Sequence, residues 1–589
     1  MSGIFLNIRL RNRVVAMFRR LGIRERTFLI IMSVIIGIAV GLGTVLFVQL
    51  LKGATWFFSQ FLPTLLGGHL WPIALVPALG GLCLAPFILR FPQESSVHGV
   101  PSTMEAVALN NGFIRWTSGF FAMILSAFTL GSGGSAGSEG PIIQIGSAFA
   151  SGVGQFFEIS GPKLRILVAC GAGAGLAAIF NAPVAGVLFA VEVVLGEFSV
   201  NSFGPIAISC VAATALSRIF LFRGAIVQFP AGRVFSSWEF LLYAAMGIAV
   251  GFSSIAFTQT MKFSERLFRE RVRIPAALKP ALGGLLVGIM GLFAPQILGY
   301  SYGPIIQAIN GNFAVGFLFL LVVAKIISTS LTLGSGGAGG ILCPSLFLGA
   351  FLGAGCGALF HHLFPLMIEH AGGYGIVGMG AMLGAVVQAP MAAIIMIFEI
   401  TGNYTVILPM MATCIIATMI HQYFMKGSIY SLSLSERGID IYAARETGIL
   451  SEMKVREFME LTFETVPASA SYAAILKKCL SGRCNCLYML NENGDLGGVI
   501  PFSQMREFIL EDSLNGLVIA QDLADSNFIF LTPDESLASS INKFSLIDME
   551  QLPVVVERNG SKKITGVLTR SRLFEAYRKE MLKRVLVRS

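Results

Sequence analysis

The chain has 589 residues, of which 54% are hydrophobic and only 13% are charged, and its mean hydropathy is +0.75. This composition excludes an ordinary soluble domain and predicts an integral membrane protein. The formal net charge of +9 comes largely from the two chain ends. The sequence contains no nucleophile paired with a base and no metal-ligand spacing, so we expect neither an enzyme nor a metal site.

The N-terminal segment 1–27 is basic and contains seven arginines: Arg9, Arg11, Arg13, Arg19, Arg20, Arg24 and Arg26. Positive charge beside a first span predicts a cytoplasmic N-terminus. Nucleic-acid binding is disfavoured, because a membrane span follows at once and the arginines can contact anionic headgroups. We expect the first span to be retained rather than cleaved as a signal peptide.

A series of apolar stretches follows, and about 20 such residues suffice to span a bilayer. The stretches are 28–51, 71–90, 112–130, 164–195, 203–222, 237–259, 275–298, 313–333, 341–363, 374–400 and 405–424. Several contain glycine and proline, as broken or re-entrant helices do. We predict a transmembrane domain over residues 28–425, built from two repeats of about 28–222 and 237–425.

Two motifs recur in the same order in these repeats. GSGGSAGSEGP at 131–141 aligns with GSGGAGGILCP at 334–344 at an offset of 203 residues, and segment 171–192 matches 378–399 at an offset of 207. Matched glycine-rich interruptions point to the ligand site of a membrane protein. Glycine exposes backbone N–H groups, and a helix N-terminus adds donors and partial positive charge. The motif therefore predicts an anion site, with close helix packing as the alternative.

Acidic residues are scarce in the membrane part. The first aspartate of the whole chain is Asp440. Cation pathways usually place acidic rings or pairs in the membrane. The scarcity favours an anion pathway and disfavours a CBS-regulated cation transporter, such as a magnesium carrier, which is the distant alternative.

The apolar character stops near residue 425, and residues 426–450 are predicted to be a linker. Segment 451–585 has ordinary charge density and contains a weak repeat. A helical run at 472–480 precedes CLYML and GGVI, and a second at 535–544 precedes LPVVV and TGVL. The Asn-Gly turns between the β-rich runs predict hairpins. This α/β segment resembles a tandem pair of CBS domains.

CBS pairs often bind adenine nucleotides through a Gly-x-x-Thr/Ser-x-x-Asp pattern after the last strand, whose Asp holds the ribose hydroxyls. The corresponding residues here are Gly498, Pro501 and Gln504 in the first copy and Gly566, Thr569 and Arg572 in the second. Both ribose carboxylates are missing. Arg572 could meet a phosphate, but it cannot accept hydrogen bonds from a ribose. We therefore expect a structural or dimerising role rather than an adenine-nucleotide site.

Four segments in order resemble the CLC family of chloride channels and proton-coupled chloride exchangers, over about residues 28–435. They are VHGVP at 97–101, GSEGP at 137–141, GILCP at 340–344 and SIYS, which contains Tyr430. The resemblance implies an all-α polytopic membrane protein with an inverted internal repeat. It also implies chloride as the transported ligand and a homodimer with one anion pathway per subunit. The protein would lie in the plasma (inner) membrane, with its N-terminus and the CBS pair in the cytoplasm.

The resemblance also assigns site residues. Glu139 would be the gating glutamate, whose carboxylate occupies the external anion site when ionised and leaves when protonated; a helix-capping glutamate is the alternative. The Tyr430 hydroxyl would donate to the central anion, unless Tyr430 is an interfacial anchor. The other anion-binding residues would be His98, Gly99, Gly137, Ser138, Gly140, Gly340, Ile341 and Leu342. Cys343 is expected to be only a small residue of its motif.

Three residues depart from the family pattern. His98 stands where many members have an anion-contacting serine, and it could add pH sensitivity. Ser138 replaces an arginine or lysine, which should weaken anion attraction at the outer mouth. Val193 stands where exchangers have a second, proton-passing glutamate, and valine cannot carry a proton. Glu192 and its counterpart Glu399 do not discriminate between channels and exchangers, since both kinds carry a glutamate at this place. We expect both residues to have a structural role.

These departures lead us to favour passive chloride conduction gated by Glu139, as in a voltage-gated channel. Proton-coupled chloride exchange is the alternative, with water or another acid replacing the inner glutamate. A fluoride-exporting branch is disfavoured because Tyr430 is present and the first motif differs. A membrane-anchored sensor is disfavoured by the duplicated core.

Overall fold

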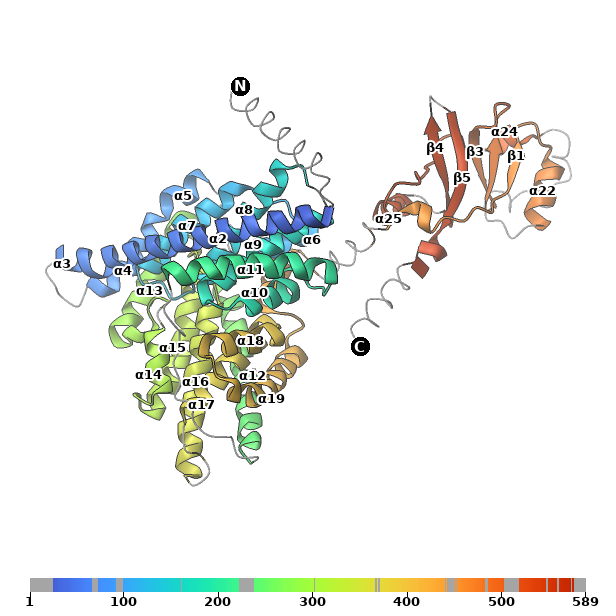
Figure 1. Cartoon of the computed structure of the whole chain (residues 1–589). Helices are drawn as coiled ribbons and strands as arrows, with labels where there is room; N and C mark the ends of the chain where they lie inside the picture. Colours follow the sequence, from blue (N-terminus) through green and yellow to red (C-terminus); the bar gives the residue numbers. More distant parts are fainter. Residues whose placement is uncertain are drawn as a thin grey trace. The chain divides into compact units, whose positions relative to one another are not determined.

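The computed structural model describes residues 25–65, 72–91, 99–159, 161–221, 238–300, 302–365, 368, 371–439, 441, 450, 453–481, 486–502, 518–546, 549–558, 561–573 and 575–576. Most of the basic arm lies outside these residues, as do His98 and Gln504. The chain divides into two compact units, Met1–Ile441 and Tyr442–Ser589 (Figure 1). Each unit is described by itself.

The first unit is helical throughout the part that the structure describes. Its first half contains α2 (Glu25–Trp56), η1 (Phe57–Phe61), α3 (Leu62–Leu65), α4 (Pro72–Cys83), α5 (Ala85–Arg90), α6 (Val100–Leu109), α7 (Trp116–Gly131), α8 (Glu139–Phe156), α9 (Pro162–Phe180), α10 (Pro183–Phe189), η2 (Ala190–Leu195) and α11 (Val200–Phe220). Its second half contains α12 (Glu239–Arg266), η3 (Leu267–Arg271), η4 (Ala276–Leu278), α13 (Lys279–Phe293), η5 (Pro295–Ile297), α14 (Gly303–Ile309), α15 (Val315–Gly334), α16 (Leu342–Leu363), α17 (Gly372–Val387), α18 (Pro390–Thr401), η6 (Tyr404–Val406), α19 (Ile407–Phe424) and α20 (Ile429–Ser435).

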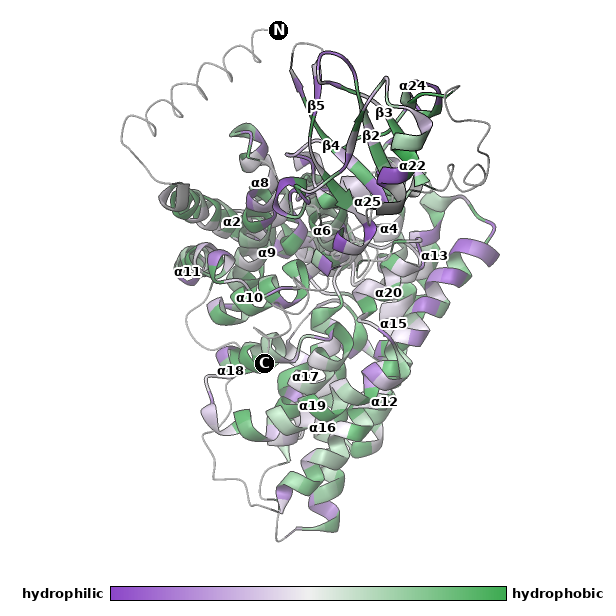
Figure 2. Cartoon of the chain, turned by 90° about the vertical axis from the view of Figure 1, so that its right-hand side faces the viewer, coloured by the Kyte–Doolittle hydropathy of each residue, from purple (hydrophilic) through white to green (hydrophobic). Residues whose placement is uncertain are grey.

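Eight helices among the described residues are long and apolar enough to cross a membrane. Large apolar side chains stay exposed along them, such as Leu42 and Leu46 on α2, as expected for a surface that faces lipid. Figure 2 shows largely apolar residues over most of these helices.

Two predicted spans are each divided in the structure. The stretch 164–195 splits into α9 and α10, and the stretch 374–400 splits into α17 and α18. The break has the same cause in both repeats. Asn181 and Gln388 adopt the left-handed conformation with φ of 55° and 60° and end one helix. A proline, Pro183 or Pro390, then begins the next, where its missing N–H costs nothing.

Glycine permits matched close packing of helices in the two repeats. A Cβ on Gly146 of α8 would clash with the Gly171 carbonyl of α9, and a Cβ on Gly349 of α16 would clash with the Gly378 carbonyl of α17. Backbones in membranes approach this closely only through small residues. The motif pair that begins at Gly171 and Gly378 therefore also packs helices, and the packing holds α8 and α16 in corresponding places.

The predicted linker 426–450 was wrong in its first part, because α20 belongs to the membrane unit. The Ser428 side chain caps α20 by accepting a hydrogen bond from the Ser431 amide at 3.2 Å. Ile429, Tyr430 and Leu434 are buried. A single apolar face on a seven-residue helix is too short to stand out in a hydropathy profile, although its burial fixes it to the core.

The second unit contains two short sheets. In the first, β2 (Cys486–Leu490) lies between β1 (Thr465–Pro467), which is parallel to it, and β3 (Leu496–Pro501), which is antiparallel. In the second, β4 (Gln551–Arg558) pairs antiparallel with β5 (Ser561–Thr569). The helices described in this unit include α22 (Tyr472–Ser481), α24 (Ala520–Leu523) and α25 (Leu537–Leu546), besides the short turn η7 (Val455–Glu457). Tyr488 and Val499 of one copy share a buried cluster with Val555 and Val567 of the other, so the two copies pack as a pair.

Candidate functional site

The two glycine-rich motifs meet at a backbone bridge. The Gly137 amide donates to the Gly340 carbonyl at 2.8 Å, and the Gly340 amide donates to the Gly137 carbonyl at 2.7 Å. Helices α8 and α16 each begin two residues after these glycines. Their N-terminal ends, which carry unpaired N–H groups and partial positive charge, are therefore brought together.

Threonines from each repeat support the bridge in a matched way. Thr332 of α15 accepts from the Ser135 amide at 3.1 Å, and Thr129 of α7 accepts from the Ala338 amide at 3.1 Å. Each residue of the first bond has its counterpart 203 positions away in the second. The pairing crosses between the repeats in both directions, so neither motif can hold this geometry alone.

Glu139 is the first residue of α8, and its carboxylate lies at the beginning of α16. The side chain is only 1% exposed. Its Oε1 accepts a hydrogen bond from the Cys343 amide at 2.9 Å, and the Leu342 amide also interacts with the carboxylate. A Cβ on Gly340 would lie 2.6 Å from Oε1, so glycine is required there. A carboxylate thus occupies the positive end of α16, as an anion would.

Lys325 is a buried cation that the sequence reasoning missed. It lies on α15 and is 3% exposed. Its Nζ donates to the Ile297 carbonyl at 2.8 Å and to the Gly299 carbonyl at 3.3 Å, and it lies 5.0 Å from the centre of the Phe347 ring. It also interacts electrostatically with Glu139. A lone lysine inside the apolar stretch 313–333 was the signal that could have found it.

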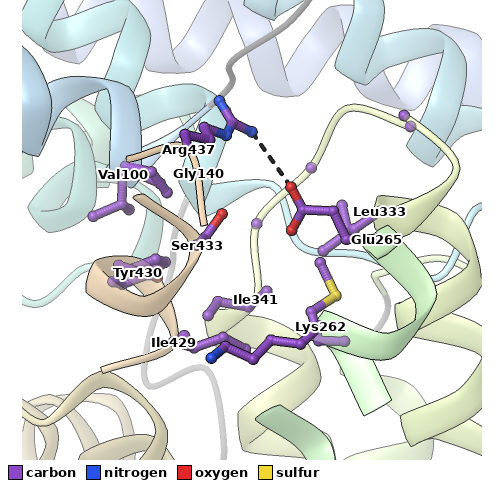
Figure 3. Close-up of a pocket in the computed structure, with 16 residues that line it drawn as sticks. Val100, Gly140, Lys262, Glu265, Leu333, Ile341, Ile429, Tyr430, Ser433 and Arg437 are labelled. Atoms are coloured by element: carbon purple, nitrogen blue, oxygen red, sulfur yellow. Dashed lines mark ion pairs between the residues drawn. The ribbon is translucent and has the colours of Figure 1, made fainter. Parts of the chain in front are cut away.

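A cavity of about 140 Å³ lies beside the bridge. Its walls come from the ends of α6, α8 and α12, from the segment that connects α15 with α16, and from α20. Gly140, Gly340, Ile341 and Tyr430 all line it (Figure 3). Four of the sequence-predicted site residues therefore surround one space.

Tyr430 is the aromatic residue that borders this cavity. It is 5% exposed, and its hydroxyl has no hydrogen-bond partner among the residues that the structure describes. A buried hydroxyl without a partner costs free energy, so such groups usually have a ligand or water. The position suits the predicted donor to an anion rather than an interfacial anchor, because the side chain is enclosed by protein.

The remaining predicted site residues that the structure describes do not line the cavity with Tyr430. The Gly99 amide is engaged by the Gln144 Oε1 at 2.6 Å, so the protein itself uses this donor. Ser138 precedes α8 and is 8% exposed, and its side chain makes no capping hydrogen bond. The structure adds the Cys343 amide to the predicted donors at the start of α16. From the sequence, Cys343 was expected to be only a small residue of its motif. His98 lies outside the described residues.

Glu192 and Glu399 each cap a helix of the opposite repeat. Glu192 accepts from the Ala392 amide of α18 at 2.9 Å, and Glu399 accepts from the Ala185 amide of α10 at 2.8 Å. These carboxylates satisfy N-terminal donors, as a capping residue does. Val193 is buried beside Glu192 in η2 and carries no titratable group.

In the part of the second unit that the structure describes, the predicted phosphate-contacting group already has partners. The Arg572 guanidinium donates to Glu460 at 2.8 Å and to Glu575 at 3.2 Å, so two carboxylates already contact the one basic group predicted to meet a phosphate. The two contacts also raise the pKa of Arg572, with the hydrogen bond to Glu460 as the main cause.

This fold, with two helix N-termini meeting around a buried carboxylate, defines a membrane anion transporter. A family model for voltage-gated chloride channels matches residues 80–422, and a CBS domain model matches residues 520–579. The chain belongs to this voltage-gated chloride channel family, the CLC family, whose transported ion is chloride. The predicted fold class is thereby confirmed: an all-α polytopic membrane protein followed by an α/β CBS region.

Named relatives cover most of the chain. A ClcB-like chloride channel protein of Ralstonia nicotianae is 32% identical over 69% of this chain and 96% of its own length. The H+/Cl− exchange transporter ClcA of Yersinia pestis bv. Antiqua is 34% identical over 74% of this chain and 94% of its own length. The crystal structure of a slow cyanobacterial Cl−/H+ antiporter matches with a TM-score of 0.64 and 26% identity, over 70% of this chain and 98% of that one.

Proposed function

We propose that this protein exchanges chloride for protons across the membrane and that Glu139 is the group at which the two ions compete. The observation that carries the proposal is the Glu139 carboxylate at the N-terminus of α16, bonded to the Cys343 amide. An ionised carboxylate and a chloride ion use the same donors, whereas a protonated carboxyl has lost its charge. Protonation of Glu139 would therefore release the site to chloride.

Relatives support exchange over passive conduction, although both kinds of protein are named among them. The exchanger ClcA is 34% identical, and the cyanobacterial antiporter has a similar fold at 26% identity. Passive conduction, which the sequence favoured, is not confirmed and stays the second candidate, because Val193 lacks the proton-carrying group that exchangers have.

The experiment uses the full chain in sealed liposomes under an outward chloride gradient, with internal chloride and pH recorded together. Exchange predicts that chloride leaving the liposomes drives protons inward against a proton gradient, and that a protonophore abolishes the proton gradient. Chloride flux that leaves the pH unchanged would overturn exchange and support passive conduction.

Three further expectations stay predictions. The dimer would use apolar side chains that remain exposed on α11 and α19, such as Ile219 and Met419, which are 76% and 63% exposed. Crosslinking of cysteines placed at these two positions tests it. The plasma-membrane location and the cytoplasmic termini are tested by labelling of the chain ends in intact and opened cells.

A further inference from the structure

The cavity beside Tyr430 has a charged wall opposite its glycine-rich wall. Lys262 and Glu265 of α12 and Arg437, just after α20, line it. The same cavity reaches Gly140, which follows Glu139 in the chain, and Gly340, which lies beside the Glu139 carboxylate. Figure 3 shows Glu265 and Arg437 reaching toward one another, joined by their ion pair. The cavity therefore connects a charged cluster with the surroundings of Glu139.

Glu265 is the only carboxylate that lines this cavity in the part of the chain that the structure describes. Among the described residues it forms an ion pair with Arg437, at 3.7 Å, which is longer than a hydrogen bond. The side chains of Glu265 and Arg437 are 21% and 31% exposed. The Glu265 carboxylate is thus partly exposed, and its contact with Arg437 is loose.

The neighbouring acid is arranged differently. Glu436 is 8% exposed and has three basic partners: Arg266 at 3.0 Å, Lys262 at 3.9 Å and Arg269 at 3.9 Å. These cations neutralise Glu436 rather than Glu265. The charged groups that share the cavity with Glu265 are therefore Lys262 from α12 and Arg437 from the end of α20, whereas Arg266 and Arg269 contact Glu436.

The resemblance places the inner proton-passing glutamate of exchangers at the position of Val193, which cannot carry a proton. Val193 has no titratable group, and the Glu192 carboxylate is bonded to the Ala392 amide of α18. The cavity offers the missing group by another route, since Glu265 and the surroundings of Glu139 share one space.

We propose that Glu265 is the cytoplasmic proton acceptor of this transporter and that its protons reach Glu139 through water in the cavity beside Tyr430. A hydronium ion on the cytoplasmic side gives its proton to the Glu265 carboxylate. The resulting carboxylic acid returns the proton to cavity water, which delivers it to the Glu139 carboxylate. Protonation of Glu265 also removes the negative charge that faces Arg437, so this arginine then attracts chloride to the same cavity. The inference rests on the proposed exchange function.

The test compares four variants of the full chain in liposomes under a chloride gradient. Glu265→Gln should retain chloride flux and lower the ratio of protons to chloride about tenfold or more. Glu265→Asp keeps the carboxylate and should restore coupling. Arg437→Gln breaks the ion pair but keeps the carboxylate, so coupling should remain. Glu270→Gln removes an exposed carboxylate on η3, outside the cavity, and should leave the ratio unchanged.

The outcomes separate this inference from the proposed function. If the unmodified protein couples protons to chloride and Glu265→Gln couples equally well, exchange stands and the assignment of Glu265 is overturned. Loss of coupling in Arg437→Gln as well would show that the ion pair, not the proton on Glu265, is what matters, and it would also overturn the assignment. If the unmodified protein moves chloride without protons, the proposed function fails, and the Glu265 proposal fails with it.

Discussion

The Glu139 carboxylate accepts a 2.9 Å hydrogen bond from the Cys343 amide, and this bond joins the two repeats at the start of α16. One repeat thus supplies the carboxylate, and the other supplies the donors. The glycine bridge between Gly137 and Gly340 holds them in register. The two repeats have matching backbones at the bridge but differ in this side chain, which is the group at which we propose that protons and chloride compete.

Gly340→Ala should displace this carboxylate. The added Cβ would lie 2.6 Å from both the Glu139 Oε1 and the Gly140 amide nitrogen, which is closer than real Cβ contacts allow. Overpacking of this kind costs about 1–3 kcal/mol, so chloride flux should fall by about tenfold. Gly316→Ala on α15 is the control, because its Cβ would meet nothing within 4 Å. Equal flux in the two variants would contradict the described geometry.

Tyr430→Phe should weaken chloride binding, since it removes a buried hydroxyl for which the described part of the chain provides no partner. A hydrogen bond to a charged group contributes about 1.5–3 kcal/mol, so the dissociation constant should rise by about tenfold or more. Calorimetric titration of the detergent-solubilised protein with chloride measures this change. Tyr423→Phe is the matched control, because Tyr423 is 83% exposed. An unchanged affinity in Tyr430→Phe would exclude the hydroxyl as an anion donor.

Lys325→Met should lower both stability and anion affinity. The change leaves the Ile297 and Gly299 carbonyls without their donor and removes a buried cation that interacts with Glu139. Each unsatisfied buried acceptor costs about 1–3 kcal/mol. Thermal unfolding with and without chloride should show a lower midpoint and a smaller increase on adding chloride. Lys52→Met, at an exposed position of α2, should show neither effect.

Glu535 should make the second CBS copy sensitive to acid. Burial alone would raise the pKa of this carboxyl, but hydrogen bonds from Ser539, Lys543 and the Thr532 amide lower it below its usual value. A lowered folded-state pKa stabilises the unit at neutral pH, and this contribution is lost as the pH falls through that pKa.

Hydrogen exchange of the segment 531–546 measures this effect in the full chain. Protection should decrease on acidification in the unmodified protein. Glu535→Gln should be less protected at neutral pH and should respond less to acid. A pH response that is the same in both proteins would contradict the role of Glu535.

The sequence predicted the parts of the site that depend on local motif chemistry. The offset of 203 residues paired Gly137 with Gly340, and both lie at the bridge. The sequence did not predict the Lys325 contacts, because the acceptors are backbone carbonyls of Ile297 and Gly299 on a different segment. Every residue has a backbone carbonyl, so residue identity does not indicate which one accepts. The same limit applies to Glu265, whose place on the cavity wall depends on how α12 packs against the end of α20.

Proton movement by Glu139→Gln tests the central claim most directly. Glutamine has nearly the shape of a protonated glutamic acid, but it has no charge and cannot release a proton. In liposomes with chloride and pH recorded together, the account predicts that this variant still moves chloride, loses its pH dependence and moves no protons. Glu158→Gln, at an exposed position after α8, should behave like the unmodified protein. Chloride-driven proton movement that persists in Glu139→Gln would contradict the account.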